Sequence, residues 1–115
     1  MEERIIIVEG KTDKQRLLQV LAEPVSIYCT NGSYSAEKAQ QLAEKIEQAA
    51  ETFVFTDEDY SGKKLRAQLE EDFPYVTHLY TKKIFTQVAN TPLDVLAEIL
   101  ERAGFAVQTD KWNQG

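Results

Sequence analysis

The stretch that decides the fold reads Ile5-Ile6-Ile7-Val8-Glu9-Gly10-Lys11. A second stretch has the same plan and reads Phe53-Val54-Phe55-Thr56-Asp57-Glu58-Asp59-Tyr60-Ser61-Gly62. Each begins with a short apolar run rich in β-branched or aromatic residues, which is typical of a buried strand. Each then passes through acidic residues and a glycine into a helical pattern. Strands that deliver carboxylates into such turns are typical of ligand sites in α/β proteins.

Three of these acidic residues are candidate metal ligands: Glu9, Asp57 and Asp59. Residues two apart in extended backbone point the same way, so both aspartates can face one ion. Carboxylate oxygens are the ligands that Mg²⁺ takes, and Mg²⁺ needs only one or two of them because it keeps several waters. We therefore expect a Mg²⁺ site, with Mn²⁺ as a substitute. The alternative is that the acidic loop only caps the helix that follows it.

Three segments together resemble the Toprim family, the catalytic domain shared by topoisomerases, bacterial primases and some nucleases. They are Val8 to Asp13, Thr30 to Ser33 and Thr56 to Gly62. Within that family the chain is similar to the Toprim half of the ribonuclease that matures 5S ribosomal RNA. The match extends from Arg4 to about Ala103. The resemblance implies a Toprim fold and a magnesium-dependent reaction at phosphodiesters.

Glu9 has two roles open to it. It could be a third metal ligand, or it could be the general acid or base of phosphoryl transfer. The resemblance implies acid-base work for the matching glutamate, in some cases with metal contact. A pair of metal ions would use all three acids, Glu9, Asp57 and Asp59. We therefore assign the three residues as both catalytic and metal-binding candidates.

The order of the remaining patterns predicts one α/β domain over residues 1–115 with a frayed tail at 111–115. Expected strands cover residues 4–8, 25–29, 52–56 and 75–80. The first two expected helices begin after a Thr12 cap and a Ser35 cap. The third begins at about residue 61, and the fourth begins at the Thr91-Pro92 pair and ends at Gly104. If Glu9 and the aspartates share a metal, strands one and three must be neighbours, so right-handed crossovers give a parallel sheet of order 2-1-3-4 with helices on both faces. Residues 105–109 could add a short edge strand, and residues 81–90 read as a loop with an extended piece at Ile84-Phe85.

Six further residues are candidates for phosphate or substrate binding. Lys11 follows the glutamate turn, and Lys82 and Lys83 follow the fourth strand, so all three could approach a substrate at the carboxyl edge. Asn31, Gly32 and Ser33 follow the second strand, and their N–H groups could hold a phosphate oxygen near a helix start. The alternatives are solvated lysines and an ordinary turn with a cap. The cluster at Lys63, Lys64 and Arg66 reads as a solvated helix face.

Composition limits the classes of protein to which the chain can belong. The net charge is −6, whereas nucleic-acid-binding domains are more often basic, so a large phosphate-gripping surface is disfavoured. Cys29 is the single cysteine, which excludes a disulfide framework and a cysteine metal site. No apolar run is long enough to span a membrane, and a cytoplasmic location is expected. Tyr60 reads as a packing or stacking residue, and His78 reads as a packed or exposed strand residue rather than a catalytic one.

These observations lead to one expected function and two alternatives. We expect magnesium-dependent processing of nucleic-acid phosphodiesters by a ribonuclease-like protein, with RNA favoured over DNA. The first alternative is a non-catalytic module that binds metal together with nucleic acid or protein. It is favoured by the acidic balance and by the expectation that the chain ends where the 5S ribosomal RNA ribonuclease begins a second domain. The second alternative, phosphate transfer on nucleotides, has no nucleotide-specific motif to support it.

Overall fold

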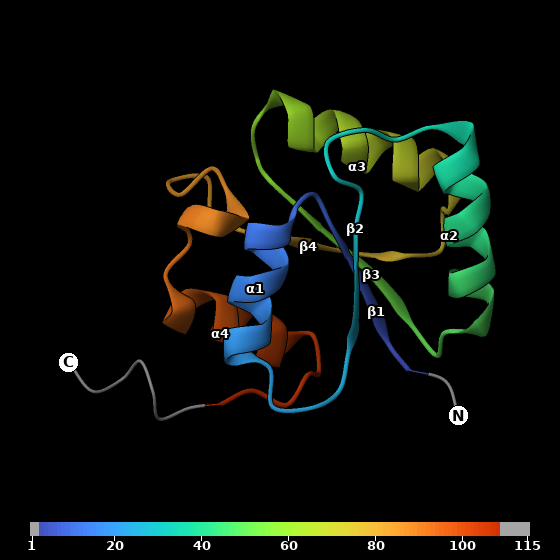
Figure 1. The fold of residues 1–115 in the computed structure, drawn as a ribbon. Coiled ribbons are helices and arrows are strands. Elements are labelled where there is room, and N and C mark those ends of the chain that lie inside the picture. Colours follow the sequence, from blue (N-terminus) through green and yellow to red (C-terminus); the bar gives the residue numbers. More distant parts are fainter. Residues whose placement is uncertain (1–2, 109–115) are drawn as a thin grey trace.

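The computed structural model describes residues 3–108, which fold into four strands that alternate with helices (Figure 1). The α-helices contain 10 to 13 residues each. None of them, within the residues described, is long and apolar enough to cross a membrane. In chain order the elements are β1 (Ile5–Val8), α1 (Lys11–Val20), β2 (Ser26–Cys29), α2 (Ala36–Gln48), β3 (Thr52–Thr56), α3 (Tyr60–Asp72), β4 (Thr77–Tyr80), the 3₁₀ helix η1 (Val88–Asn90) and α4 (Leu93–Arg102).

The four strands form one parallel sheet of order β2-β1-β3-β4, which confirms the predicted topology. In the register, Ile6 of β1 lies opposite Ile27 of β2 on one side and Phe53 of β3 on the other. Because β1 and β3 are adjacent and parallel, their carboxyl ends meet at the same edge of the sheet. The chain order reverses between these two strands, and ligands of open α/β sheets bind at such a point.

Side chains alternate along β1 and supply both layers of the core. Ile6 and Val8 pack with residues of α1 and α4, whereas Ile5 and Ile7 pack with residues of α2 and α3. Figure 1 shows the corresponding layers, with α1 and α4 on one side of the sheet and α2 and α3 on the other. A strand covered on both faces must be apolar throughout, which is why the sequence of β1 is a continuous run rather than an alternating pattern.

Helix α1 begins earlier than predicted, and the predicted Thr12 cap is wrong. Gly10 is the N-cap, and its N–H donates a 3.1 Å hydrogen bond to Oδ2 of Asp13. Asp13 therefore takes the capping-box position, as the third residue of the helix. Gly10 has φ −144°, an extended conformation that any residue adopts, so the turn does not need its backbone freedom. Leu18 is 48% exposed, and the buried apolar face of the helix is formed by Leu17, Val20 and Leu21.

The other predicted helix boundaries hold closely. The Ser35 side chain accepts a hydrogen bond from the N–H of Lys38 at the start of α2, as expected for an N-cap. Helix α3 begins one residue before the expected start and buries Leu65 and Leu69. Pro92 is the N-cap of α4 rather than its first helical residue, and Gly104 follows the end of α4 with φ 95°. A positive φ at this place favours glycine, which explains the stop.

Two predicted extended segments are not strands. Ile84 and Phe85 lie in a turn held by the N–H groups of Phe85 and Thr86, which donate to the carbonyls of Lys82 and Lys83. The segment after α4 does not join the sheet. It pairs with the end of α1 through the antiparallel bridge between Leu21 and Val107. The edge strand predicted for residues 105–109 is therefore a single isolated bridge within residues 105–108. Residue 109 and the predicted tail at 111–115 lie outside the described residues.

Candidate metal centre

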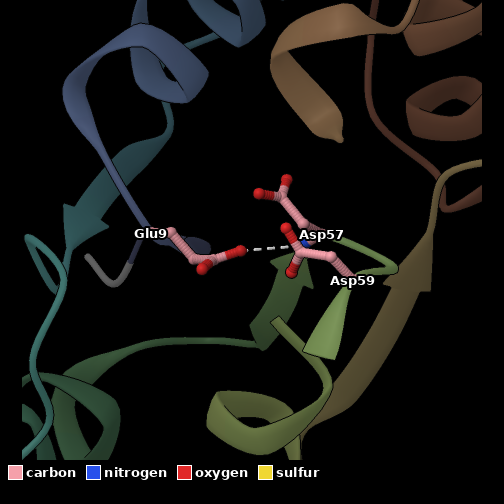
Figure 2. Close-up of side chains that lie close together, drawn as sticks. All are labelled: Glu9, Asp57 and Asp59. Carbon is pink, nitrogen blue, oxygen red and sulfur yellow. Dashed lines mark hydrogen bonds between the residues drawn. The ribbon is translucent and has the colours of Figure 1, made fainter. Parts of the chain in front are cut away.

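The side chains of Glu9, Asp57 and Asp59 converge at the carboxyl edge of the sheet. One oxygen from each carboxylate lies within 4.8 Å of the others. Glu9 follows β1, and the two aspartates belong to the turn between β3 and α3, so the neighbouring strands place them together. Figure 2 shows the side chains of Glu9 and Asp59 facing each other, with the carboxylate of Asp57 beside them. Three hard oxygen donors at this spacing are a donor set that suits Mg²⁺.

A backbone hydrogen bond fixes Glu9 in this cluster. The N–H of Asp57 donates to Oε2 of Glu9 at 2.8 Å, drawn as the dashed line in Figure 2. Burial raises the pKa of Glu9 to about 7, and the negative charges of Asp57 and Asp59 add to the rise, while the hydrogen bond from Asp57 opposes it. A carboxyl group that titrates near neutrality can both take up and release a proton at the pH of the cell.

Asp57 is anchored on its other side by the segment that follows β4. Its Oδ1 atom accepts a 2.7 Å hydrogen bond from the N–H of Val88, the first residue of η1. Beside this bond, the N–H of Glu58 donates to the carbonyl of Thr86 at 2.6 Å. Thr86 has φ 62°, a left-handed conformation that the two flanking contacts hold in place. The loop after β4 is therefore a support of the acidic turn.

Asp59 caps α3 and also belongs to the cluster. Its Oδ1 atom accepts a 2.8 Å hydrogen bond from the N–H of Gly62. A Cβ atom on Gly62 would lie 2.2 Å from the carbonyl oxygen of Asp57, so only glycine fits there. Asp59 therefore does cap the helix, as the alternative interpretation stated. The capping hydrogen bond also holds its carboxylate in the cluster, so the two roles are compatible.

The middle acid of the turn, Glu58, points away from the cluster. Its Oε2 atom lies 3.5 Å from the guanidinium of Arg66. Arg66 is only 8% exposed, so its prediction as part of a solvated helix face is wrong. It donates to the carbonyls of Thr56 and Leu79 and contacts Nδ1 of His78, and thereby ties the ends of β3 and β4 together. His78 lies in β4 with a largely buried side chain, which is one of the two placements expected for it.

A fourth acid lies near the cluster and was not predicted as part of the site. Asp13 is 7% exposed, and it accepts the capping hydrogen bond from Gly10. Burial raises the pKa of Asp13, and the negative charge of Asp57 raises it further. The signal in the sequence was its place three residues after the turn glycine, the N3 position at which a carboxylate reaches back to the cap.

Two of the six predicted substrate residues line a pocket at the site, and the other four do not. Gly32 and Ser33 line a pocket beside Glu9, together with Lys64 of α3. The N–H of Asn31 donates a 2.7 Å hydrogen bond to the carbonyl of Glu9, so that amide supports the turn and has no free proton for a phosphate. The lysines at 11, 82 and 83 are exposed, form no ion pair within residues 3–108, and do not line this pocket.

Residues 4–89 match the family model of the Toprim domain. The chain belongs to the Toprim family. The small Toprim-domain protein from Bacillus stearothermophilus has a solved structure that superposes with a TM-score of 0.88 at 42% identity, over 94% of this chain and 91% of that one. The uncharacterized protein YusF of Bacillus subtilis is 38% identical over 107 residues, which are 93% of this chain and 73% of YusF. The predicted resemblance to the Toprim family is thus confirmed.

Similarity to ribonuclease M5 is more distant and covers less of both chains. The Mycoplasma pneumoniae enzyme is 37% identical over 67 residues, which are 58% of this chain and 36% of the enzyme. The Lactiplantibacillus plantarum enzyme is 34% identical over 76 residues, or 40% of its length. This Toprim chain therefore matches less than half of either ribonuclease.

Proposed function

We propose that this Toprim protein is a magnesium-dependent enzyme that cleaves nucleic-acid phosphodiester bonds, with RNA as the preferred substrate. The observation that carries the proposal is the convergence of Glu9, Asp57 and Asp59, with one oxygen of each within 4.8 Å of the others. Such a cluster of negative charge at the switch point of an α/β sheet is costly unless a cation or protons neutralise it. Family membership supports the same assignment.

The donor set of this structure fits a divalent metal ion. Asp57 and Asp59 would hold Mg²⁺, and Glu9 lies close enough to add a third oxygen. A bound Mg²⁺ supplies Lewis-acid stabilisation of the charge that develops on the phosphate. The hydrogen bonds from Val88 to Asp57 and from Gly62 to Asp59 hold both carboxylates in place before any ligand arrives. Such preorganisation avoids a reorganisation cost during the reaction.

Glu9 is the candidate acid-base group. Its pKa of about 7 lets it accept a proton from the attacking water or donate one to the leaving oxygen. Its hydrogen bond from the N–H of Asp57 directs the carboxyl group toward the cluster. Asp57 and Asp59 then act as ligands, and Glu9 moves the proton. The preference for RNA rests on the distant similarity to ribonuclease M5.

A non-catalytic binding module is the competing function, because the net charge of −6 disfavours a broad grip on phosphates. A cleavage assay separates the two. Labelled RNA and DNA panels would be incubated with wild-type protein in Mg²⁺, Mn²⁺ or EDTA, and with the Glu9→Gln and Asp57→Asn variants. Glu47→Gln, an exposed site on α2, is the matched control.

We expect RNA cleavage in Mg²⁺ that EDTA abolishes. Glu9→Gln should slow turnover by about 10²–10⁴-fold, the usual contribution of an acid-base group, and Glu47→Gln should leave it unchanged. If the wild-type protein binds metal and RNA but cleaves no substrate, the protein is a binding module. Cleavage that survives both EDTA and Glu9→Gln would contradict the assigned site.

A further inference from the structure

Glu9 also lines a pocket of about 270 Å³, which neither Asp57 nor Asp59 lines. One wall is the loop that follows β2, and the other is helix α3. The pocket opens next to the carboxylate proposed to handle the proton. Whatever occupies it would therefore be joined to, or adjacent to, the phosphate at which the reaction takes place.

The helical wall is a polar face of α3. Ser61, Lys64, Leu65 and Gln68 line it at spacings of three, four and seven residues, which place side chains on one side of a helix. Three of the four are polar, and Lys64 brings a positive charge. Leu65 is the apolar residue of this wall and is buried. The wall thus offers hydrogen-bonding groups and one cation around a small apolar surface.

The loop wall is fixed before any ligand binds. The ammonium of Lys38 donates to the carbonyls of Thr30 and Ser33 and to the Ser33 hydroxyl, and thereby ties the loop to α2. Thr30 lines the pocket and is only 1% exposed. Its hydroxyl oxygen has no hydrogen-bond partner among the described residues. A buried hydroxyl without a partner is costly, and a polar ligand in the pocket would supply one.

The pocket borders a second hollow that disfavours a continuing nucleic-acid strand, and Tyr34 and Gln68 line both. The hydroxyl of Tyr34 donates a 2.6 Å hydrogen bond to the carboxylate of Asp72, which holds the tyrosine in place between the two. Beyond Tyr34 and Gln68 the surface is hollowed again, but Glu71 and Asp72 line that second hollow. Two acidic side chains repel phosphate, so a strand that enters beside Glu9 has no favourable path past Gln68.

We propose that the pocket holds one unpaired nucleotide, an inference that rests on the function proposed above. Lys64 pairs with a phosphate of that nucleotide, Ser33, Ser61 and Gln68 hydrogen-bond its sugar and base, and Leu65 with the Tyr34 ring makes the apolar contact. The volume of about 270 Å³ lies near the lower end of the range of about 300–1,000 Å³ for small-molecule sites, which suits one nucleotide and is too small for a base pair. The nucleotide is free, terminal in a strand, or unpaired within one.

The test measures binding without cleavage. A short fluorescent single-stranded RNA, the blunt duplex of the same sequence, and the competitors AMP and UMP would be titrated in EDTA by fluorescence anisotropy. The single strand should bind at least about tenfold more tightly than the duplex, as expected if one base pair must open. Displacement by AMP or UMP identifies a free or terminal nucleotide as the ligand, and its absence identifies a nucleotide within the strand. Equal binding of strand and duplex would overturn the proposal.

Variants of the lining residues test whether binding takes place in the pocket. Lys64→Ala and Gln68→Leu should each weaken single-strand binding, by about tenfold for Lys64 because a contact to a charged group is lost. The matched controls are Lys63→Ala, on the neighbouring helix position outside the pocket, and Gln41→Leu on α2, both at exposed residues. Equal affinities for pocket and control variants, or no binding by wild type, would overturn the proposal. The binding test is done without metal, so its result does not depend on catalysis. If the protein binds the single strand in the pocket but does not cleave RNA in Mg²⁺, only the proposed function is contradicted.

Discussion

The N–H of Asp57 donates a 2.8 Å hydrogen bond to the carboxylate of Glu9, joining two turns that lie 48 residues apart in the chain. This bond holds the acid proposed to move protons against the acid proposed to bind metal. It also means that the backbone after β3 and the side chain after β1 are positioned as one unit. The adjacency of β1 and β3 in the sheet makes the bond geometrically available.

Metal binding should stabilise the wild-type protein through this unit. A cation that binds only the folded state at ten times its dissociation constant adds about 1.4 kcal/mol to the free energy of unfolding. Asp57→Asn should remove most of this gain, because it removes a ligand and its charge. Thermal unfolding with and without Mg²⁺ measures the effect. Asp94→Asn, at an exposed position on α4, should keep the full gain. Identical Mg²⁺ curves for wild type and Asp57→Asn would refute the ligand assignment.

Glu9 should make stability depend on pH when metal is absent. Its pKa is about 7 in the folded protein against 4.5 for an unperturbed glutamate, so the folded state binds more protons than the unfolded state between these values. Stability should therefore fall as pH rises from about 4.5 to 7 and change little above that, as far as Glu9 is concerned. Asp13, whose pKa is also raised, adds to the fall at the acidic end.

The Glu9→Gln variant tests this assignment. Glutamine still accepts the hydrogen bond from Asp57 but carries no charge. It should raise the free energy of unfolding at pH 8 by about 1–2 kcal/mol, less than the full shift would give because Glu9 is only half-buried. Chemical denaturation in EDTA at several pH values measures it. A variant that unfolds like wild type at every pH would show that Glu9 titrates normally.

Gly62→Ala should disrupt the acidic turn, although alanine is the better helix former by about 1 kcal/mol. The added Cβ would lie 2.2 Å from the Asp57 carbonyl oxygen, so the turn or the helix must shift. We expect a loss of about 1–3 kcal/mol in stability together with weaker metal binding. Gly10→Ala is the control, since its Cβ has no neighbour closer than 4.0 Å, and its cost should stay below about 1 kcal/mol. Equal costs for the two variants would contradict the packing described.

The sheet order and the acidic cluster could be predicted from the sequence because the information is local. Glu9 and Asp57 directly follow apolar runs, Asp59 comes two residues after Asp57, and right-handed crossovers leave few orders for four parallel strands. The start of α1 was misplaced because Thr12 and Asp13 are both good capping residues, and only the path of the chain decides between them. The role of Arg66 could not be predicted, since a surface-like Lys-Lys-x-Arg pattern does not reveal that β4 will cover its last residue. The segment after α4 has a strand-like composition, but it pairs with the end of α1 through Leu21 and Val107 instead of joining the sheet.

Arg66→Met should be strongly destabilising. The guanidinium donates to the carbonyls of Thr56 and Leu79 and faces the largely buried carboxylate of Glu58, so its loss leaves these groups without their partner. We expect a loss of about 3–5 kcal/mol, as for other broken buried pairs. Lys63→Met, at an exposed site on the same helix, should change stability by about 0.5 kcal/mol or less. Urea denaturation of both variants measures the difference, and a mild effect at Arg66 would mean that water replaces the guanidinium.

The most direct test of the metal centre is anomalous diffraction from crystals of the wild-type protein soaked in Mn²⁺. The account predicts an anomalous peak between the carboxylates of Glu9, Asp57 and Asp59, at metal–oxygen distances of about 2.0–2.2 Å from at least one aspartate, values close to those of Mg²⁺ sites. Crystals of Asp57→Asn treated in the same way should lose the peak. A wild-type map with no peak at the cluster, or with Mn²⁺ bound only elsewhere on the protein, would contradict the account.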